Sequence, residues 1–169
     1  MKRPPLKNLL LTALFAALTA MGAFLRIPLG SSSVTLQFFF TCMAGLLLGP
    51  YWGAASQLLY VLLGLTGLPI FSQGGGLMYV AHPTFGFLLG LIPAAFFAGL
   101  FAKKHRWLSY LFALIFLYAL GLPYLYFSMG SSFTLRQTLV YGCLIFLPFD
   151  GIKIFCAELL SRHLKGALP

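Results

Sequence analysis

The sequence predicts an all-α, polytopic membrane protein whose six helices form one transmembrane bundle. The 169 residues are 60% hydrophobic and 8% charged, and the mean hydropathy is +0.96. A soluble domain carries about 25% charged residues, so this chain has too little polar surface to cover a globule in water. A helix that crosses a bilayer needs about 20 apolar residues, and the length therefore allows about six spans with short loops. We expect a single integral-membrane domain over residues 1–169.

Apolar runs between turn-forming residues place the six helices. The expected ranges are 8–25, 36–48, 52–65, 85–101, 107–127 and 138–160. The second and third helices are short for a full span, and the Gly49-Pro50 turn between them predicts antiparallel neighbours. A re-entrant hairpin over residues 36–65 would leave four spans. Four is also an even number, so both termini would still lie on the same side of the membrane. We prefer six spans, because short helices cross a bilayer when they tilt or when loops extend them.

The basic residues are distributed as in a multi-pass protein of the cell membrane. Six spans would put Arg26 and Arg136 on one side of the bilayer and eight other bases on the opposite side. The eight are Lys2, Arg3, Lys7, Lys103, Lys104, Arg106, Arg162 and Lys165. Because cytoplasmic loops carry the excess of Lys and Arg, both termini are expected in the cytoplasm. Small basic clusters between apolar runs also argue against nucleic acid as the partner of this +9 chain.

Several kinds of chemistry lack the residues that they need. Cys42, Cys143 and Cys156 have no paired spacing, so they are interpreted as small hydrophobic residues rather than disulfides. His82 has no second His or Cys at ligand spacing, and we therefore expect no metal site and no cofactor. The sequence has no G-x-x-x-x-G-K-[ST] loop, so uphill transport driven by ATP would need another subunit to hydrolyse it.

The stretch FLPFDGIKIF, residues 146–155, carries an acid three positions before a base inside a long apolar run. Residues three apart share one helix face, so Asp150 and Lys153 are expected to lie together. A charge at the centre of a spanning helix costs about 2.5–3.5 kcal/mol, and such residues usually face a partner or a polar cavity. The pair is either a structural ion pair or a ligand site, and the residues alone favour neither. Pro148 leaves a carbonyl free one turn earlier and predicts a kink beside the pair.

Two further features lie outside this pair. Glu158, the only other acid, comes about one turn before the end of the last helix, where solvation or pairing with Arg162 is expected. Ala13 and Ala17 in the first helix are four residues apart and form a stripe of small residues that another helix can approach closely. The stripe serves either packing within this bundle or docking of a partner membrane subunit.

Two polar loops hold the other candidate binding residues. Thr35 and Gln37 open the second helix before Phe38; a glutamine there offers a donor and an acceptor, although an exposed cap residue is the simpler interpretation. The loop SQGGGLMYVAHPTFGF has a glycine triplet at 74–76 that permits close backbone approach or a mobile lid. Its aromatic and polar side chains suit either a small-molecule site or an outer aromatic belt, and for His82 alone the belt is favoured. These side chains are Tyr79, His82, Thr84, Phe85 and Phe87.

Several motifs, taken in order, resemble one membrane-protein family. They are LTALFAALTAMGAFLRIPLG, VTLQFFFTCMAGLLLGPYWGAASQLLYVLLGLTGLPIF, GGG…PTFGFLLGL and FLPFDGIKI. Together they resemble BioY, the biotin-specific S component of energy-coupling factor (ECF) transporters. The resemblance runs from the first helix to the fourth and returns in the sixth, whereas the fifth helix carries little of it. The order of T-L-Q, L-L-L-G-P, G-L-P-x-F and D-x-x-K is specific, although no single piece is.

The resemblance implies a six-helix membrane protein that captures biotin near the outer face and works with a transmembrane coupling subunit and two ATPase subunits. It implies that Ala13 and Ala17 contact the coupling subunit, and that the outer loops close over the ligand. It also implies that Asp150 and Lys153 hold the polar groups of biotin. With the polar and aromatic side chains of the loops, the expected ligand-binding residues are Asp150, Lys153, Gln37, Thr35, Phe38, Tyr79, His82, Thr84 and Phe85. The chain has AHPTFGF where the family often has G-P-T-G-G-Y, so the loop contacts follow less directly from the resemblance than the pair in the last helix.

Two other functions compete with this interpretation. A membrane-embedded enzyme would use Asp150, Lys153 and His82 as acid–base groups, but the sequence has neither a G-x-S-x-G nor an H-E-x-x-H motif. An S component for another vitamin would share the architecture, although the motifs favour biotin.

Overall fold

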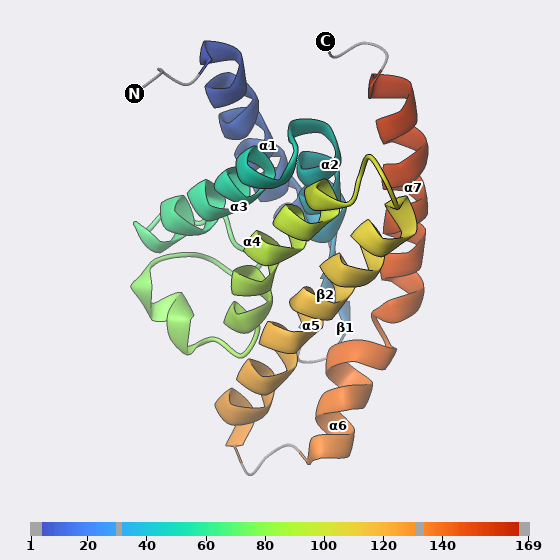
Figure 1. Cartoon of the computed structure of the whole chain (residues 1–169). Coiled ribbons are helices and arrows are strands. Elements are labelled where there is room, and N and C mark those ends of the chain that lie inside the picture. The colour runs from blue at the N-terminus through green and yellow to red at the C-terminus, as the bar shows by residue number, and fades with distance from the viewer. Residues whose placement is uncertain (1–4, 30–31, 131–133, 166–169) are drawn as a thin grey trace.

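The computed structural model describes residues 5–29, 32–130 and 134–165 and shows a helical bundle with one small β-hairpin (Figure 1). In chain order the elements are α1 (Leu6–Phe24), β1 (Arg26–Leu29), β2 (Ser32–Thr35), α2 (Gln37–Leu48), α3 (Pro50–Leu65), the 3₁₀-helix η1 (Leu77–Ala81), α4 (Phe85–Leu100), α5 (Arg106–Met129), α6 (Leu135–Leu139), the π-helical turn η3 (Val140–Leu144) and α7 (Leu147–Lys165). The predicted helical membrane bundle is confirmed, and the first five helices begin and end within two residues of the expected positions.

The last helix, predicted as one element over residues 138–160, is broken into α6, η3 and α7. The Ile145 N–H donates to the carbonyl of Val140 at 3.2 Å, five residues back, which is the π-helical pattern. A proline inside a helix removes a donor and clashes with the preceding turn, whereas in the first turn it costs nothing. Pro148 stands in the first turn of α7. The break therefore comes just before the proline and places Asp150 at the start of a new helix.

The loop predicted over residues 26–37 contains an antiparallel hairpin. Arg26 lies opposite Thr35, and Ile27 lies opposite Val34. The β-branched residues of both strands favour extended backbone. The Leu36 N–H donates to the carbonyl of Gly22 at 3.0 Å, which holds the hairpin against the end of α1.

The loop between α3 and α4 folds back onto α3. Phe71 is 1% exposed and lies over Gly64, where a Cβ would come within 2.1 Å of its ring. Gly75 approaches the Leu68 carbonyl so closely that a Cβ would lie 2.0 Å from the oxygen, so the glycine triplet serves close backbone approach. The guanidinium of Arg26 donates to the Ser72 carbonyl and joins this loop to the hairpin.

Helix α4 lies at the centre of the bundle, where it packs along α5 and crosses α2 and α3, while α7 packs chiefly on α2. Small residues permit these crossings. A Cβ on Gly45 of α2 would lie 2.3 Å from the carbonyl oxygen of Ala95 and 2.8 Å from the Cβ of Ala98, both on α4. The two backbones are therefore in direct contact at this point.

The two ends of the bundle differ in what they carry. The start of α1, the α2–α3 turn, the α4–α5 connection and the end of α7 lie together at one end (Figure 1). The hairpin, the α3–α4 loop, the end of α5 and the start of α6 lie at the other end. In the part of the chain that the structure describes, three segments are long and apolar enough to cross a membrane: Leu6–Phe24, Arg106–Met129 and Leu135–Leu164. The 12 residues of α2 extend for only about 18 Å, less than the roughly 30 Å of a hydrocarbon core.

We predict that Gly45→Ala destabilises the protein. The new Cβ meets a carbonyl oxygen of α4 that cannot rotate away, so α2 and α4 must separate, and overpacking of this kind costs about 1–3 kcal/mol. Thermal unfolding of the purified protein in detergent measures the effect. Gly151→Ala is the matched control, because its Cβ meets no atom within 4 Å. Equal unfolding midpoints for the two variants would contradict the prediction.

Candidate functional site

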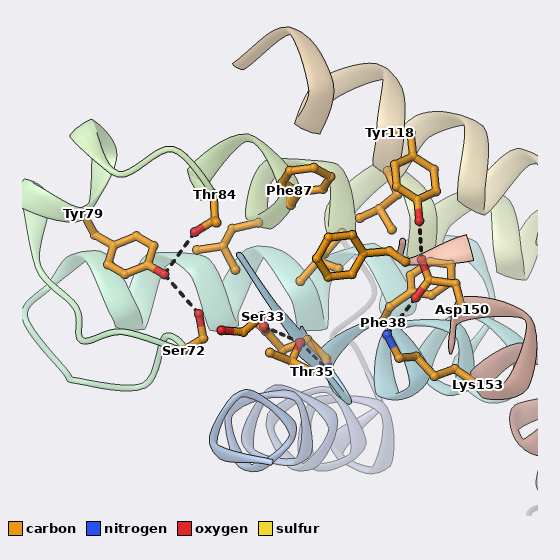
Figure 2. A pocket seen from close by; sticks show the side chains of 15 residues that line it. Ser33, Thr35, Phe38, Ser72, Tyr79, Thr84, Phe87, Tyr118, Asp150 and Lys153 are labelled. Atoms are coloured by element: carbon orange, nitrogen blue, oxygen red, sulfur yellow. Dashed lines mark hydrogen bonds and ion pairs between the residues drawn. The ribbon is translucent and has the colours of Figure 1, made fainter. Parts of the chain in front are cut away.

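A pocket opens between the hairpin, the α3–α4 loop and the helices α2, α4, α5 and α7 (Figure 2). It encloses about 670 Å³ of empty space, including its open mouth, which is within the size range of small-molecule sites. Its lining consists of Ser33, Thr35, Gln37, Phe38, Ser72, Tyr79, Thr84, Phe87, Leu88, Leu91, Leu117, Tyr118, Phe146, Asp150 and Lys153. Figure 2 shows Tyr79, Ser72 and Thr84 at one end of the pocket and Asp150, Lys153 and Tyr118 at the other. Ser33 and Thr35 of the hairpin lie between these two ends.

The charged end of the pocket is built on the first two turns of α7. Lys153 donates from Nζ to Oδ1 of Asp150 at 2.7 Å, and the two residues are 7% and 3% exposed. Tyr118 of α5 donates its hydroxyl to Oδ2 of the same carboxylate at 2.6 Å. Each carboxylate oxygen thus already accepts one hydrogen bond. A carboxylate has about four acceptor sites and an ammonium three donors, so both groups keep capacity for a ligand.

The hydroxyl end of the pocket is supplied by the α3–α4 loop. The Tyr79 hydroxyl lies 3.2 Å from Oγ of Ser72 and 3.3 Å from Oγ1 of Thr84. His82 is stacked on the Tyr79 ring, and its Nδ1 lies 2.8 Å from Oγ1 of Thr84. Burial lowers the pKa of His82, and a neutral ring leaves Nδ1 free to accept the Thr84 N–H at 3.3 Å. His82 therefore lies behind the wall of the pocket and contacts the two side chains, Tyr79 and Thr84, that form it.

Gln37 connects the pocket to the bundle. Its Oε1 accepts the Thr35 hydroxyl at 2.8 Å, and its Nε2 donates to the hydroxyl of Tyr60 at 2.8 Å. Tyr60 in turn donates to the carbonyl of Ile70 at 3.0 Å. Gln37 is 7% exposed, so the simpler interpretation of it as an exposed cap residue is wrong. The chain of hydrogen bonds ties α2, α3 and the α3–α4 loop together at the wall of the pocket.

Most of the candidate residues from the sequence meet at this pocket. Seven of the nine line it: Thr35, Gln37, Phe38, Tyr79, Thr84, Asp150 and Lys153. His82 lies behind Tyr79, and Phe85 is 5% exposed in the core with its ring edge against Tyr124. Sequence reasoning missed Tyr118, whose only signal is a phenol within an apolar helix, where a buried hydroxyl needs a partner.

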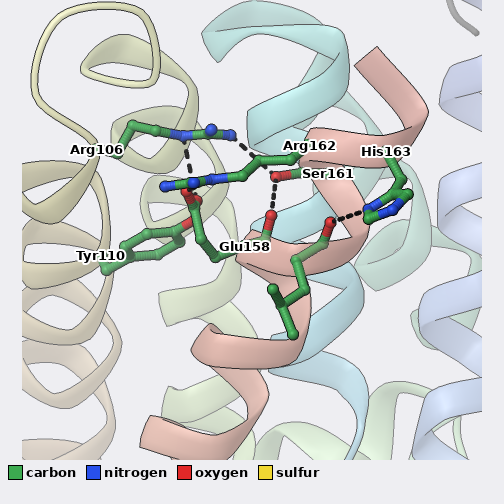
Figure 3. Close-up of polar contacts among 7 residues, drawn as sticks. Arg106, Tyr110, Glu158, Ser161, Arg162 and His163 are labelled. Carbon is green, nitrogen blue, oxygen red and sulfur yellow. Dashed lines mark hydrogen bonds and ion pairs between the residues drawn. The ribbon is translucent and has the colours of Figure 1, made fainter. Parts of the chain in front are cut away.

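A second polar cluster joins α5 to the far end of α7, away from the pocket (Figure 3). Glu158 accepts from Nε of Arg162 at 2.6 Å and lies 3.1 Å from Nε of Arg106, and the Tyr110 hydroxyl also donates to it. Arg106 donates to Oγ of Ser161 at 3.0 Å. The predicted Glu158–Arg162 pair is present, and Arg106 extends it across the helix interface.

Comparison with known proteins agrees with this architecture. The sequence model of the BioY family matches residues 1–169. The chain belongs to the BioY family. A probable biotin transporter BioY of Lysinibacillus sphaericus is 39% identical, with 99% of this chain and 89% of the relative covered. The biotin transporter BioY of Thermotoga maritima is 36% identical, with 95% of this chain and 96% of the relative covered.

A solved structure has the same fold. It is the crystal structure of the S-component for biotin from an ECF-type ABC transporter, with a TM-score of 0.84 and 30% identity; 95% of this chain and 92% of the solved chain are covered. BioY proteins are transport components rather than enzymes, which speaks against the interpretation of Asp150 and Lys153 as catalytic groups. Among the residues that the structure describes, no cluster of three His, Cys, Asp or Glu side chains could hold a metal ion.

We predict that Tyr60→Phe lowers the thermal stability of the ligand-free protein. The substitution leaves the buried Nε2 of Gln37 without its acceptor, and an unsatisfied buried donor costs about 1–3 kcal/mol. Thermal unfolding in detergent tests this. Tyr51→Phe is the control, because Tyr51 is 77% exposed and the variant keeps the ring contact with Phe96. A midpoint for Tyr60→Phe equal to that of the control would refute a stabilising role for this bond.

Proposed function

We propose that the whole chain, residues 1–169, is a biotin-binding S component of an ECF-type importer, and that the pocket of Figure 2 holds the vitamin. The observation that carries the proposal is a buried acid–base pair that faces a ligand-sized pocket in a protein of this family. The names of the relatives and of the solved structure support biotin as the ligand.

The chemistry of the pocket fits the two ends of biotin. Its ureido group presents N–H donors beside a carbonyl acceptor. Asp150 accepts from such N–H groups, and Lys153 donates to the adjacent carbonyl. The apolar ring system and side chain pack against Phe38 and Phe87 and the leucines of α4 and α5. The carboxylate of the ligand lies toward the hydroxyl end of the pocket, where hydroxyl donors of the α3–α4 loop are available.

The outer face of α1 is the docking surface for a transmembrane coupling subunit. Ala13 and Ala17 are both exposed, and they share that face with the exposed Leu10 and Leu14. Internal packing therefore does not use the stripe, which supports the docking interpretation. The family resemblance implies two ATPase subunits, in agreement with the lack of a phosphate-binding loop in this chain.

The protein lies in the cell membrane with both termini in the cytoplasm. The start of α1, the basic α4–α5 connection and the end of α7 lie at one end of the bundle, and the positive-inside rule assigns that end to the cytoplasm. The hairpin and the α3–α4 loop, which supply the mouth of the pocket, then face the outside.

We predict that Asp150→Asn weakens biotin binding about 100-fold, because a hydrogen bond to a charged group contributes about 1.5–3 kcal/mol. Isothermal titration of the purified protein measures the affinity. Glu158→Gln is the matched control, since Glu158 is the other acid of α7 and lies outside the pocket. Unchanged affinity in Asp150→Asn would remove that residue from the site. A panel of other vitamins in the same assay tests the choice of ligand, and tighter binding of another vitamin would overturn biotin.

We predict that Ala13→Trp prevents co-purification with a coupling subunit while biotin affinity stays unchanged. The indole occupies the space into which a partner helix must come, and close approach is what small residues at such interfaces permit. Ala119→Trp is the control, because Ala119 is an exposed alanine on α5, away from the α1 face. Retention of the complex by Ala13→Trp, or its loss in both variants, would argue against this docking surface.

A further inference from the structure

Helices α5 and α7 are joined by two tyrosine–carboxylate contacts. Tyr118 donates to Asp150, and Tyr110 donates to Glu158. The tyrosines are eight residues apart on α5 and the acids eight residues apart on α7. The two contacts have the same chemistry, but they differ in their surroundings. Tyr118 and Asp150 line the pocket, whereas Tyr110 and Glu158 do not.

The hydroxyl of Tyr118 meets the carboxylate from the side opposite to the ammonium. Lys153 occupies Oδ1 and Tyr118 occupies Oδ2. Both oxygens therefore have a fixed direction, and the plane of the carboxylate cannot rotate freely. Tyr118 is 8% exposed and its ring meets the edge of Phe87 at a centroid distance of 6.3 Å, so the donor itself is held in place by packing.

A neutral donor also preserves the charge of the site. Lys153 already balances the charge of Asp150, so a second cation would leave the site with a net positive charge and would compete with a ligand N–H. A phenol orients the carboxylate without neutralising it, and a hydrogen bond to an ionised group is stronger than a neutral one. The remaining acceptor sites of Asp150 thus keep a fixed direction toward the pocket.

We propose that Tyr118 is a positioning residue for ligand recognition: it acts through Asp150, by fixing the carboxylate so that its free acceptor sites meet the N–H donors of the ligand. The inference rests on the proposed function, because it requires Asp150 to contact the ligand. It assigns a role to α5, the helix that carries least of the family's sequence motifs.

The test uses three single variants and one double variant, each titrated with biotin. Tyr118→Phe removes only the hydroxyl, and we expect the dissociation constant to rise about tenfold. Tyr110→Phe removes the same group from the other contact, and we expect a change of less than about twofold, as is usual for a site outside the pocket. The stoichiometry of the titration reports the folded fraction, so each dissociation constant refers to folded protein.

A double-mutant cycle separates positioning from packing. If Tyr118 acts through Asp150, Tyr118→Phe adds less than about twofold in the Asp150→Asn background, because the carboxylate that it orients is gone. A packing role would weaken binding by the same factor in both backgrounds, and that result would overturn the inference. Equal losses in Tyr118→Phe and Tyr110→Phe would overturn it too.

The same series distinguishes the two levels of the argument. Full affinity in Tyr118→Phe together with a large loss in Asp150→Asn would refute the role of Tyr118 alone. Full affinity in Asp150→Asn would refute the proposed binding site, and the role of Tyr118 with it.

Discussion

The burial of Asp150 and Lys153 in an apolar bundle is the constraint on which the rest of the site depends. Neither charge is stable there alone, and removing one partner of a buried pair costs about 3–5 kcal/mol. The structure meets this demand by pairing the two side chains at 2.7 Å and by adding the Tyr118 hydroxyl from α5. A polar pocket in a membrane bundle needs such compensation from several helices. The pocket therefore depends on how α2, α5 and α7 pack.

The opposite end of the pocket meets a different requirement, because it is built on loops whose own polar groups must be satisfied. Phe71 anchors the α3–α4 loop over Gly64, and the Tyr60 hydroxyl donates to the carbonyl of Ile70 in that loop. Through Gln37 the same tyrosine reaches the entry to α2. The shape of this wall is thus set by the bundle that it packs on, which lets the α3–α4 loop hold its hydroxyl groups in a defined place.

The proposed binding site and the proposed docking surface lie on different faces of the molecule, and α1 separates them. On its inner face, Thr19 accepts a hydrogen bond from Gln57 of α3 at 3.2 Å, and Gln57 accepts the hydroxyl of Thr41 of α2 at 3.0 Å. Hydrogen bonds of this kind hold helices together in lipid, where the hydrophobic effect does not. The outer face, with Ala13 and Ala17, is left exposed. A partner that approaches this face meets a helix already held firmly by its own bundle.

The sequence by itself predicted the membrane environment, the first five helices and the pairing of Asp150 with Lys153. Composition, the length of apolar runs and an i,i+3 spacing can all be taken directly from the sequence. It also indicated seven of the residues that line the pocket, from the charges in the last helix and the polar and aromatic side chains around the loops. Only the tertiary structure decided the partner of Asp150 on α5, the break before Pro148, the hairpin after α1 and the withdrawal of His82 and Phe85 from the pocket lining. Helix α5 is apolar on nearly every side, so no stripe in its sequence indicates which face turns inward. Its packing along α4 sets that rotation and brings Tyr118 to a carboxylate 32 residues away.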